Sequence, residues 1–157
     1  MIKIVHPVAG ATALLTILTF WLATAFSELF GSADTIVAIK TAIPWGFLLL
    51  IPALAATGGT GFNLSRGRRP AVISTKIRRT AVSAANGLMI LVPSALFLAH
   101  KAQVEEFDAA FYAVQALELI CGAVNITLLG LNMRDGFKIK GRFRRPTDPR
   151  PAINRGV

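Results

Sequence analysis

The chain has 157 residues, a formal net charge of +9, a hydrophobic share of 54% and a mean hydropathy of +0.58. Because this apolar share exceeds that of a typical soluble domain, we expect a one-domain integral membrane protein. The basic residues are grouped between apolar segments, where anionic lipid headgroups account for them, so we exclude nucleic acid as a partner. The single cysteine, Cys121, excludes an internal disulfide framework.

Four segments are long and apolar enough to cross a bilayer. About 20 helical residues, at about 1.5 Å each, span the hydrocarbon layer with every backbone hydrogen bond made inside the helix. We therefore predict an all-α integral membrane protein, an antiparallel four-helix transmembrane bundle formed by residues 1–133. Its helices are expected at about 5–28, 40–62, 78–100 and 109–133.

The first helix, at 5–28, has a second interpretation as a cleaved secretory signal. Lys3 precedes the apolar run, and residues 23–25, with the sequence ATA, resemble a cleavage site. We favour a retained helix, because one lysine makes a weakly charged leader. Small and polar residues recur at steps of three and four and predict a face that packs against other helices, namely Ala9, Thr12, Thr16, Thr19, Ala23 and Ser27.

The second and third helices, at 40–62 and 78–100, contribute fewer polar groups. Counting residues from the helix ends places Asn86 of the third helix near the depth of Asn125 in the fourth. The same count places Lys40 at the outer end of the second helix, too far from the membrane centre to reach Glu118.

The fourth helix, at 109–133, carries a polar seam at helical spacing. Glu118 lies near the membrane midplane, at the depth of Thr16, and the seam continues through Gln115, Asn125 and Asn132. An acid in hydrocarbon is costly, which makes Glu118 a functional-site hypothesis. Two interpretations stay open: a site that responds to protons or cations, and a protonated side chain that ties two helices together.

The cytoplasmic ends of the helices bring a second set of candidates to one level. His6 and Met133 have the chemistry of axial haem ligands, so a b-type haem is an alternative to simple interfacial and packing roles. Four basic residues could contact haem propionates or lipid headgroups: Lys76, Arg78, Arg79 and Arg134.

Residues 134–157 differ in composition from the membrane domain. They are basic, contain three prolines and predict a mostly disordered cytoplasmic tail. We expect Gly136 to end the fourth helix. Just before it, a structural latch is expected between the ends of the third and fourth helices, formed by Asn132, Arg134 and Asp135 with Arg78 and Arg79.

The distribution of basic residues predicts the orientation. All 17 lysines and arginines except Lys40 and Lys101 fall on one side of a four-span topology. The positive-inside rule then places both termini in the cytoplasm of a cell with an inner (plasma) membrane. On the other side, an acidic loop could hold a cation or remain solvated, and no metal site is predicted from its residues His100, Glu105, Glu106 and Asp108.

The sequence contains no phosphate-binding glycine loop, no HExxH and no convincing Ser/His/Asp set, which argues against a conventional enzyme. We therefore favour a non-enzymatic accessory subunit of a larger membrane complex, or a small homo-oligomer. Two alternatives remain: a proton- or ion-coupled small transporter that uses Glu118, and a haem-bearing electron-transfer protein that uses His6.

Overall fold

The computed structural model describes residues 2–65 and 71–139, which are helical except at two short connections, 31–32 and 104–108. The helices are α1 (Ile2–Phe30), α2 (Ala33–Ser65), α3 (Ala71–Asn86), α4 (Val92–Gln103) and α5 (Ala109–Ile139). A π-helical turn, η1 (Gly87–Leu91), joins α3 to α4 and makes one continuous third rod.

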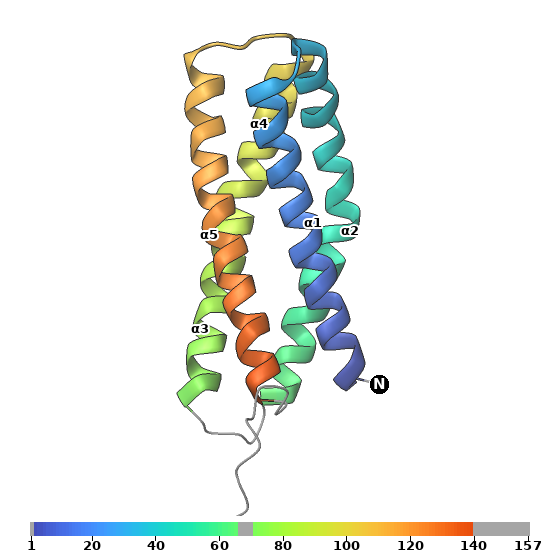
Figure 1. The fold of residues 1–157 in the computed structure, drawn as a ribbon, viewed down its shortest axis with the longest axis vertical. Helices are drawn as coiled ribbons and strands as arrows, with labels where there is room; N and C mark the ends of the chain where they lie inside the picture. The colour runs from blue at the N-terminus through green and yellow to red at the C-terminus, as the bar shows by residue number, and fades with distance from the viewer. Residues whose placement is uncertain (1, 66–70, 140–157) are drawn as a thin grey trace, which may run out of the picture.

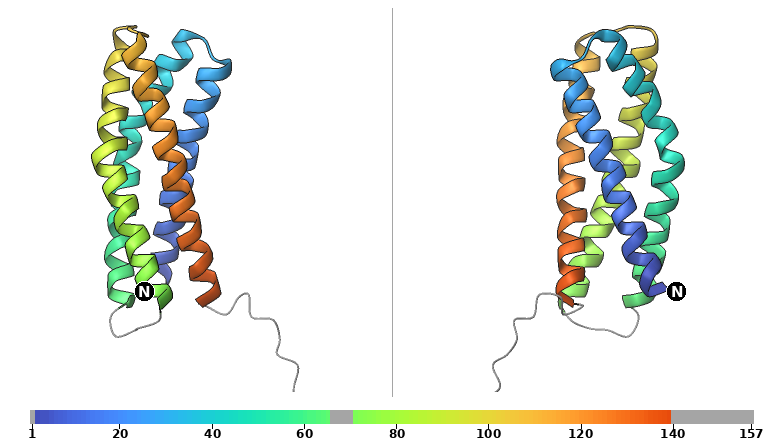
Figure 2. Two further views of the ribbon diagram at one scale, coloured as in Figure 1. Left: turned by 90° about the vertical axis from the view of Figure 1, so that its left-hand side faces the viewer. Right: turned by 45° about the vertical axis from the view of Figure 1, so that its right-hand side comes forward.

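The four rods run antiparallel in a bundle (Figures 1 and 2). Helix α1 packs against α2 and α5, and α4 also packs against α2 and α5, whereas α2 and α5 lie diagonally across the bundle and their backbones do not approach closely. The connections 31–32 and 104–108 lie together at one end, which we call the short-loop end. The start of α1 and the end of α5 lie at the opposite, terminal end.

Large apolar side chains are exposed on the outer surface of all four rods. All four rods contain a stretch long and apolar enough to cross a membrane, at Ile4–Phe30, Ala33–Asn63, Ile77–Gln103 and Ala109–Phe137. Large apolar side chains such as Trp45, Leu48 and Met89 are more than 70% exposed on it. Since such a surface is stable in lipid and not in water, the chain is a four-span membrane protein. The predicted antiparallel four-helix bundle is confirmed, whereas the placement of both termini in the cytoplasm stays a prediction.

Two apolar clusters fill the interior. One joins α1 and α2 through Ala13, Ile17, Leu50 and Ala53. The other lies nearer the short-loop end and joins α2, α4 and α5 through Ile36, Leu98, Ala102 and Phe111. Small residues let the rods approach closely, as membrane helices require.

The packing face of α1 matches the predicted one only in part. Ser27 is buried, as predicted, but the other buried residues are Ala13, Ile17 and Thr24, and Thr19 is exposed. The hydroxyl of Thr16 donates to the Thr12 carbonyl of its own helix, at 2.9 Å, and not to Glu118. The face is rotated because glycines on other helices leave room for large α1 side chains: a Cβ at Gly122 would lie 2.8 Å from the Trp21 ring.

The helices extend beyond the apolar segments that predicted them. Helix α2 begins at Ala33, seven residues before Lys40, and α5 continues through Gly136 to Ile139. The prediction that Gly136 ends the fourth helix is therefore wrong. Residues 140–157 of the predicted tail, and 66–70 of the basic connection, lie outside the described residues.

Candidate functional site

A charged pair lies in the interior between α2 and α5. The Lys40 ammonium donates to the Glu118 carboxylate at 2.7 Å, and their side chains are only 1% and 14% exposed. The expectation that Lys40 cannot reach Glu118 is wrong. Because α2 begins at Ala33, Lys40 lies about two turns, or roughly 10 Å, inside the helix.

The lysine bridges the diagonal of the bundle. Lys40 shares its helix face with Ile36 and Ile43, four residues before it and three after, and all three are buried. The backbones of α2 and α5 do not approach closely, and the long side chain of Lys40 covers the distance between them to reach Glu118. The apolar neighbours of Lys40 thus fix its direction, and Glu118 provides its partner.

A second acid, Glu28, belongs to the same cluster. It lies in the last turn of α1, and the electrostatic influence of both Lys40 and Glu118 reaches it. Its Oε1 atom is buried without a hydrogen-bond partner in the described part of the chain. The sequence analysis took Glu28 as the outer end of the first helix, at 5–28, and did not assign it to a site; its position four residues after Thr24, on the same helix face, is the signal that could have found it. The cluster therefore contains two carboxyl groups and one amine.

Gln115 adds an amide one turn closer to the short-loop end than Glu118. Its side chain is 4% exposed, and neither its oxygen nor its nitrogen has a partner among the described residues. A buried polar group without a partner costs about 1–3 kcal/mol. Such a group is available to a bound ligand and has no evident role in stabilising the bundle.

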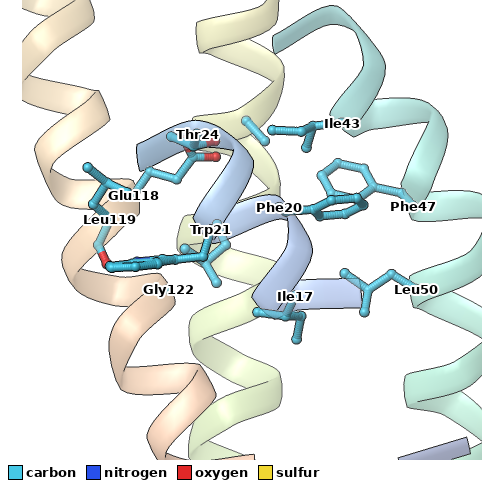
Figure 3. A pocket seen from close by; sticks show the side chains of 12 residues that line it. Ile17, Phe20, Trp21, Thr24, Ile43, Phe47, Leu50, Glu118, Leu119 and Gly122 are labelled. Carbon is cyan, nitrogen blue, oxygen red and sulfur yellow. The ribbon is translucent and has the colours of Figure 1, made fainter. Parts of the chain in front are cut away.

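A small cavity of about 60 Å³ lies beside Glu118 (Figure 3). Glu118 and Thr24 line one edge of it, and the other walls are apolar and include the aromatic side chains of Phe20, Trp21 and Phe47. The Trp21 indole donates to the Leu119 carbonyl at 2.9 Å, which fixes the ring as one wall. The full lining comprises Ile17, Phe20, Trp21, Thr24, Ile43, Phe47, Leu50, Leu91, Ala95, Glu118, Leu119 and Gly122.

The polar seam of α5 continues toward the terminal end in a pair of amides. Asn86 donates to the Asn125 side chain at 3.0 Å and to the Cys121 carbonyl at 2.9 Å. Asn125 is 3% exposed, and the π-helical turn η1 begins directly after Asn86. The structure thus brings together the two asparagines that depth counting placed at one level.

The predicted latch between the third rod and α5 is present in part. Arg79 donates to Asp135 at 2.8 Å, and Asn132 donates to the Thr80 hydroxyl at 3.0 Å. The Arg134 guanidinium lies 3.6 Å from the Asp135 carboxylate and is largely exposed, and the Arg78 side chain is also exposed. The side chain of Lys76 lies outside the described part of the structure.

The candidate haem ligands are not brought together as an opposed pair. His6 is hydrogen-bonded through Nδ1 to the Thr60 hydroxyl, at 3.0 Å, and its ring lies against Gly61 of α2. Met133 is 38% exposed on α5. His6 thus contacts α2, and the predicted pairing of His6 with Met133 stays a prediction.

The acidic loop at the short-loop end is organised by Lys101. Its ammonium donates to Glu106 at 2.6 Å and to Asp108 at 2.9 Å. Asp108 also accepts the Phe111 amide at 2.9 Å, which caps the start of α5. The bond from Lys101, followed by that from Phe111, lowers the pKa of the Asp108 carboxyl. Lys101 therefore supplies the positive charge of this loop, and residues 2–65 and 71–139 contain no metal-ligand cluster.

The fold and the site define a four-span membrane protein with a charged cluster buried in its interior. Comparison of the chain with models of protein families, with curated proteins and with solved structures finds no match. The function is therefore argued from the site alone.

Proposed function

We propose that the protein is a small transporter that binds and releases a proton, or another monovalent cation, at the cluster of Glu28, Lys40 and Glu118. The observation that carries this proposal is the buried ion pair between Lys40 and Glu118, with a second carboxyl group within electrostatic range. In lipid, ionisable side chains inside the bundle mark ion and proton pathways more often than packing.

The net charge of the three ionisable groups indicates what the cluster can bind. If all three groups are ionised, two carboxylates face one ammonium, and the interior carries one unbalanced negative charge. A charge of this kind in a low-dielectric interior is costly and is removed by one bound proton or cation. Uptake and release of that single positive charge is the elementary step of an ion-coupled carrier.

Stability alone gives little reason to retain these groups. A buried ion pair is often no more stabilising than apolar side chains of the same volume. Next to the ion pair, the interior is filled by apolar side chains alone, namely those of Ile36, Leu98, Ala102 and Phe111. The cluster therefore supports a role in ion binding better than a role as a tie between helices.

The position of the polar groups supports access from both ends of the bundle. Glu28 lies two residues from the end of α1 at the short-loop end, and Glu118 lies nine residues, or about 14 Å, inside α5. Beyond the cavity, the polar seam continues through the pairs Asn86–Asn125 and Thr80–Asn132. We propose that transport follows this seam.

The test is proton flux in liposomes that contain the purified full-length protein and a pH-sensitive dye. After a pH step, we expect protein-dependent flux in the wild type and its loss in Glu118→Gln, which keeps the size of the side chain and removes its charge. Glu105→Gln, a substitution at an exposed loop acid, is the matched control and should leave the flux unchanged. Equal flux in wild type and Glu118→Gln contradicts the proposal.

A second candidate, an accessory subunit or homo-oligomer, is supported by two glycines of α2. Among the described residues, a Cβ added at Gly58 or Gly59 would meet no atom of another helix within 4 Å. Glycine inside a helix costs roughly 0.5–1 kcal/mol relative to alanine, and close approach of a partner helix would offset this cost.

The test of this second candidate is the mass of the protein–detergent complex. Gly58→Leu should dissociate an oligomer or a larger complex, whereas Ile120→Leu, at a lipid-exposed position of α5, should not. A wild type that is purely monomeric and co-purifies with no other subunit contradicts this candidate.

A further inference from the structure

We propose that the cavity beside Glu118 binds a small organic cation, a short alkylammonium ion, in competition with the proton. The inference rests on the proposed function and names the class of its substrate. It is carried by three features of the cavity: its aromatic walls, its single carboxylate and its size.

The walls suit the apolar body of such a cation. Phe20 and Phe47 meet edge to face, with ring centroids 6.4 Å apart, and Trp21 closes a further side. Aromatic faces attract organic cations, and the attraction grows when water is excluded. Glu118 and the Thr24 hydroxyl provide the polar edge at which the ammonium nitrogen would bind.

The size of the cavity limits the ligand. One water-sized atom occupies about 10–15 Å³ of such a volume, so 60 Å³ holds about four to six non-hydrogen atoms. Ethylammonium and trimethylammonium, with three and four non-hydrogen atoms, fit within this volume. Tetraethylammonium, with nine, exceeds it.

The charge of the cluster explains the competition. Glu28 of α1, Lys40 of α2 and Glu118 of α5 together need one more positive charge, which either a proton or an alkylammonium ion supplies. The third rod contributes only Leu91 and Ala95 to the cavity and no titratable group. Only one of the two cations is needed at a time, so binding of the amine should release a proton.

The experiment uses the fluorescence of Trp21 in the full-length protein in lipid nanodiscs. The chain has two tryptophans, so Trp45→Phe, at a position 75% exposed to lipid, leaves the cavity residue as the sole reporter. We expect a saturable change with ethylammonium, no saturable change with tetraethylammonium, and a weaker apparent affinity for ethylammonium at acidic pH. Absence of saturation, or an affinity independent of pH, overturns the inference.

Two variants in the Trp45→Phe background locate the site. Glu118→Gln should weaken ethylammonium binding at least about tenfold, the effect of losing one hydrogen bond to a charged group. Ala95→Leu fills the cavity and leaves every charge in place, so it should also abolish binding. Undiminished binding in either folded variant overturns the inference; if one fails to fold, the other variant and the pH dependence decide.

Failure of this inference is distinguishable from failure of the proposed function. Proton flux that requires Glu118, without ethylammonium binding, removes the amine site and keeps the proton carrier. Ethylammonium binding without any proton flux keeps the cavity site and removes the carrier.

Discussion

Replacing Lys40 by methionine removes one partner of the buried ion pair and keeps the length of the apolar stem. At 2.7 Å and an effective dielectric constant of about 20, the attraction between Lys40 and Glu118 is about 6 kcal/mol. Desolvation of the two groups offsets much of this attraction. Loss of one partner from a buried pair costs about 3–5 kcal/mol, because the other charge stays in the interior.

The double variant Lys40→Met/Glu118→Leu is the informative companion. With both charges replaced by apolar side chains, we expect a free energy of unfolding close to or above that of the wild type. The two single substitutions should therefore be strongly non-additive, with a coupling energy of about 3 kcal/mol. The assay is reversible unfolding in mixed detergent micelles, followed by helical circular dichroism.

One control completes this test. Lys101→Met, at an ion-paired lysine in the last turn of α4, is the matched control and should lower the unfolding free energy much less than Lys40→Met. Additive effects of the two single substitutions would refute the assignment of a buried, interacting pair.

The remaining predictions concern other parts of the chain. Asn125→Ala should destabilise the bundle by about 0.6–1.7 kcal/mol in the same unfolding assay, whereas Ala substitution of the exposed Asn63 should have no measurable effect. Asp135→Asn should cost about 1 kcal/mol and speed amide hydrogen exchange in the last turn of α5. Because its pKa is lowered in the folded protein, Asp108 stabilises the start of α5 above the ordinary carboxyl pKa of about 4, and this contribution is lost as the pH falls through the lower folded value. Exchange of the Phe111 amide should accelerate over that acidic range in the wild type and show no such transition in Asp108→Asn. In a Cys121→Ser background, a cysteine introduced at Glu105 should react with an impermeant thiol reagent from outside intact cells, and one introduced at Arg134 should not.

The class of fold follows from the sequence because the membrane imposes it. Length and apolar composition predict four spanning helices, since a chain in hydrocarbon must satisfy its backbone hydrogen bonds internally. The polar spacing of α5 also predicts the buried amides of Asn125 and Asn132, because residues three and four apart share a helix face. Counting residues from the helix ends places Asn86 and Asn125 at the same depth, and their side chains are hydrogen-bonded to each other.

The charged cluster could not be predicted in the same way. The sequence prediction ends the first helix at Glu28 and begins the second at Lys40. Both helices continue past these residues, so the distance of each residue from the helix end was underestimated. The rotation of each helix was a second unknown, because it depends on contacts between distant residues. Trp21 faces Gly122 and the Leu119 carbonyl, and this contact turns α1 away from the threonine face that its own sequence suggested.

The central claim is that the Glu28, Lys40 and Glu118 cluster exchanges a proton while it remains buried. The most direct measurement is the infrared difference spectrum of the protein in lipid, recorded on a pH step, in the region of the protonated carboxyl stretch. We predict a band that appears on acidification, is absent in Glu118→Gln or Glu28→Gln, and persists in the exposed-loop variant Glu105→Gln. A spectrum in which neither buried-acid substitution changes the carboxyl bands would contradict the claim.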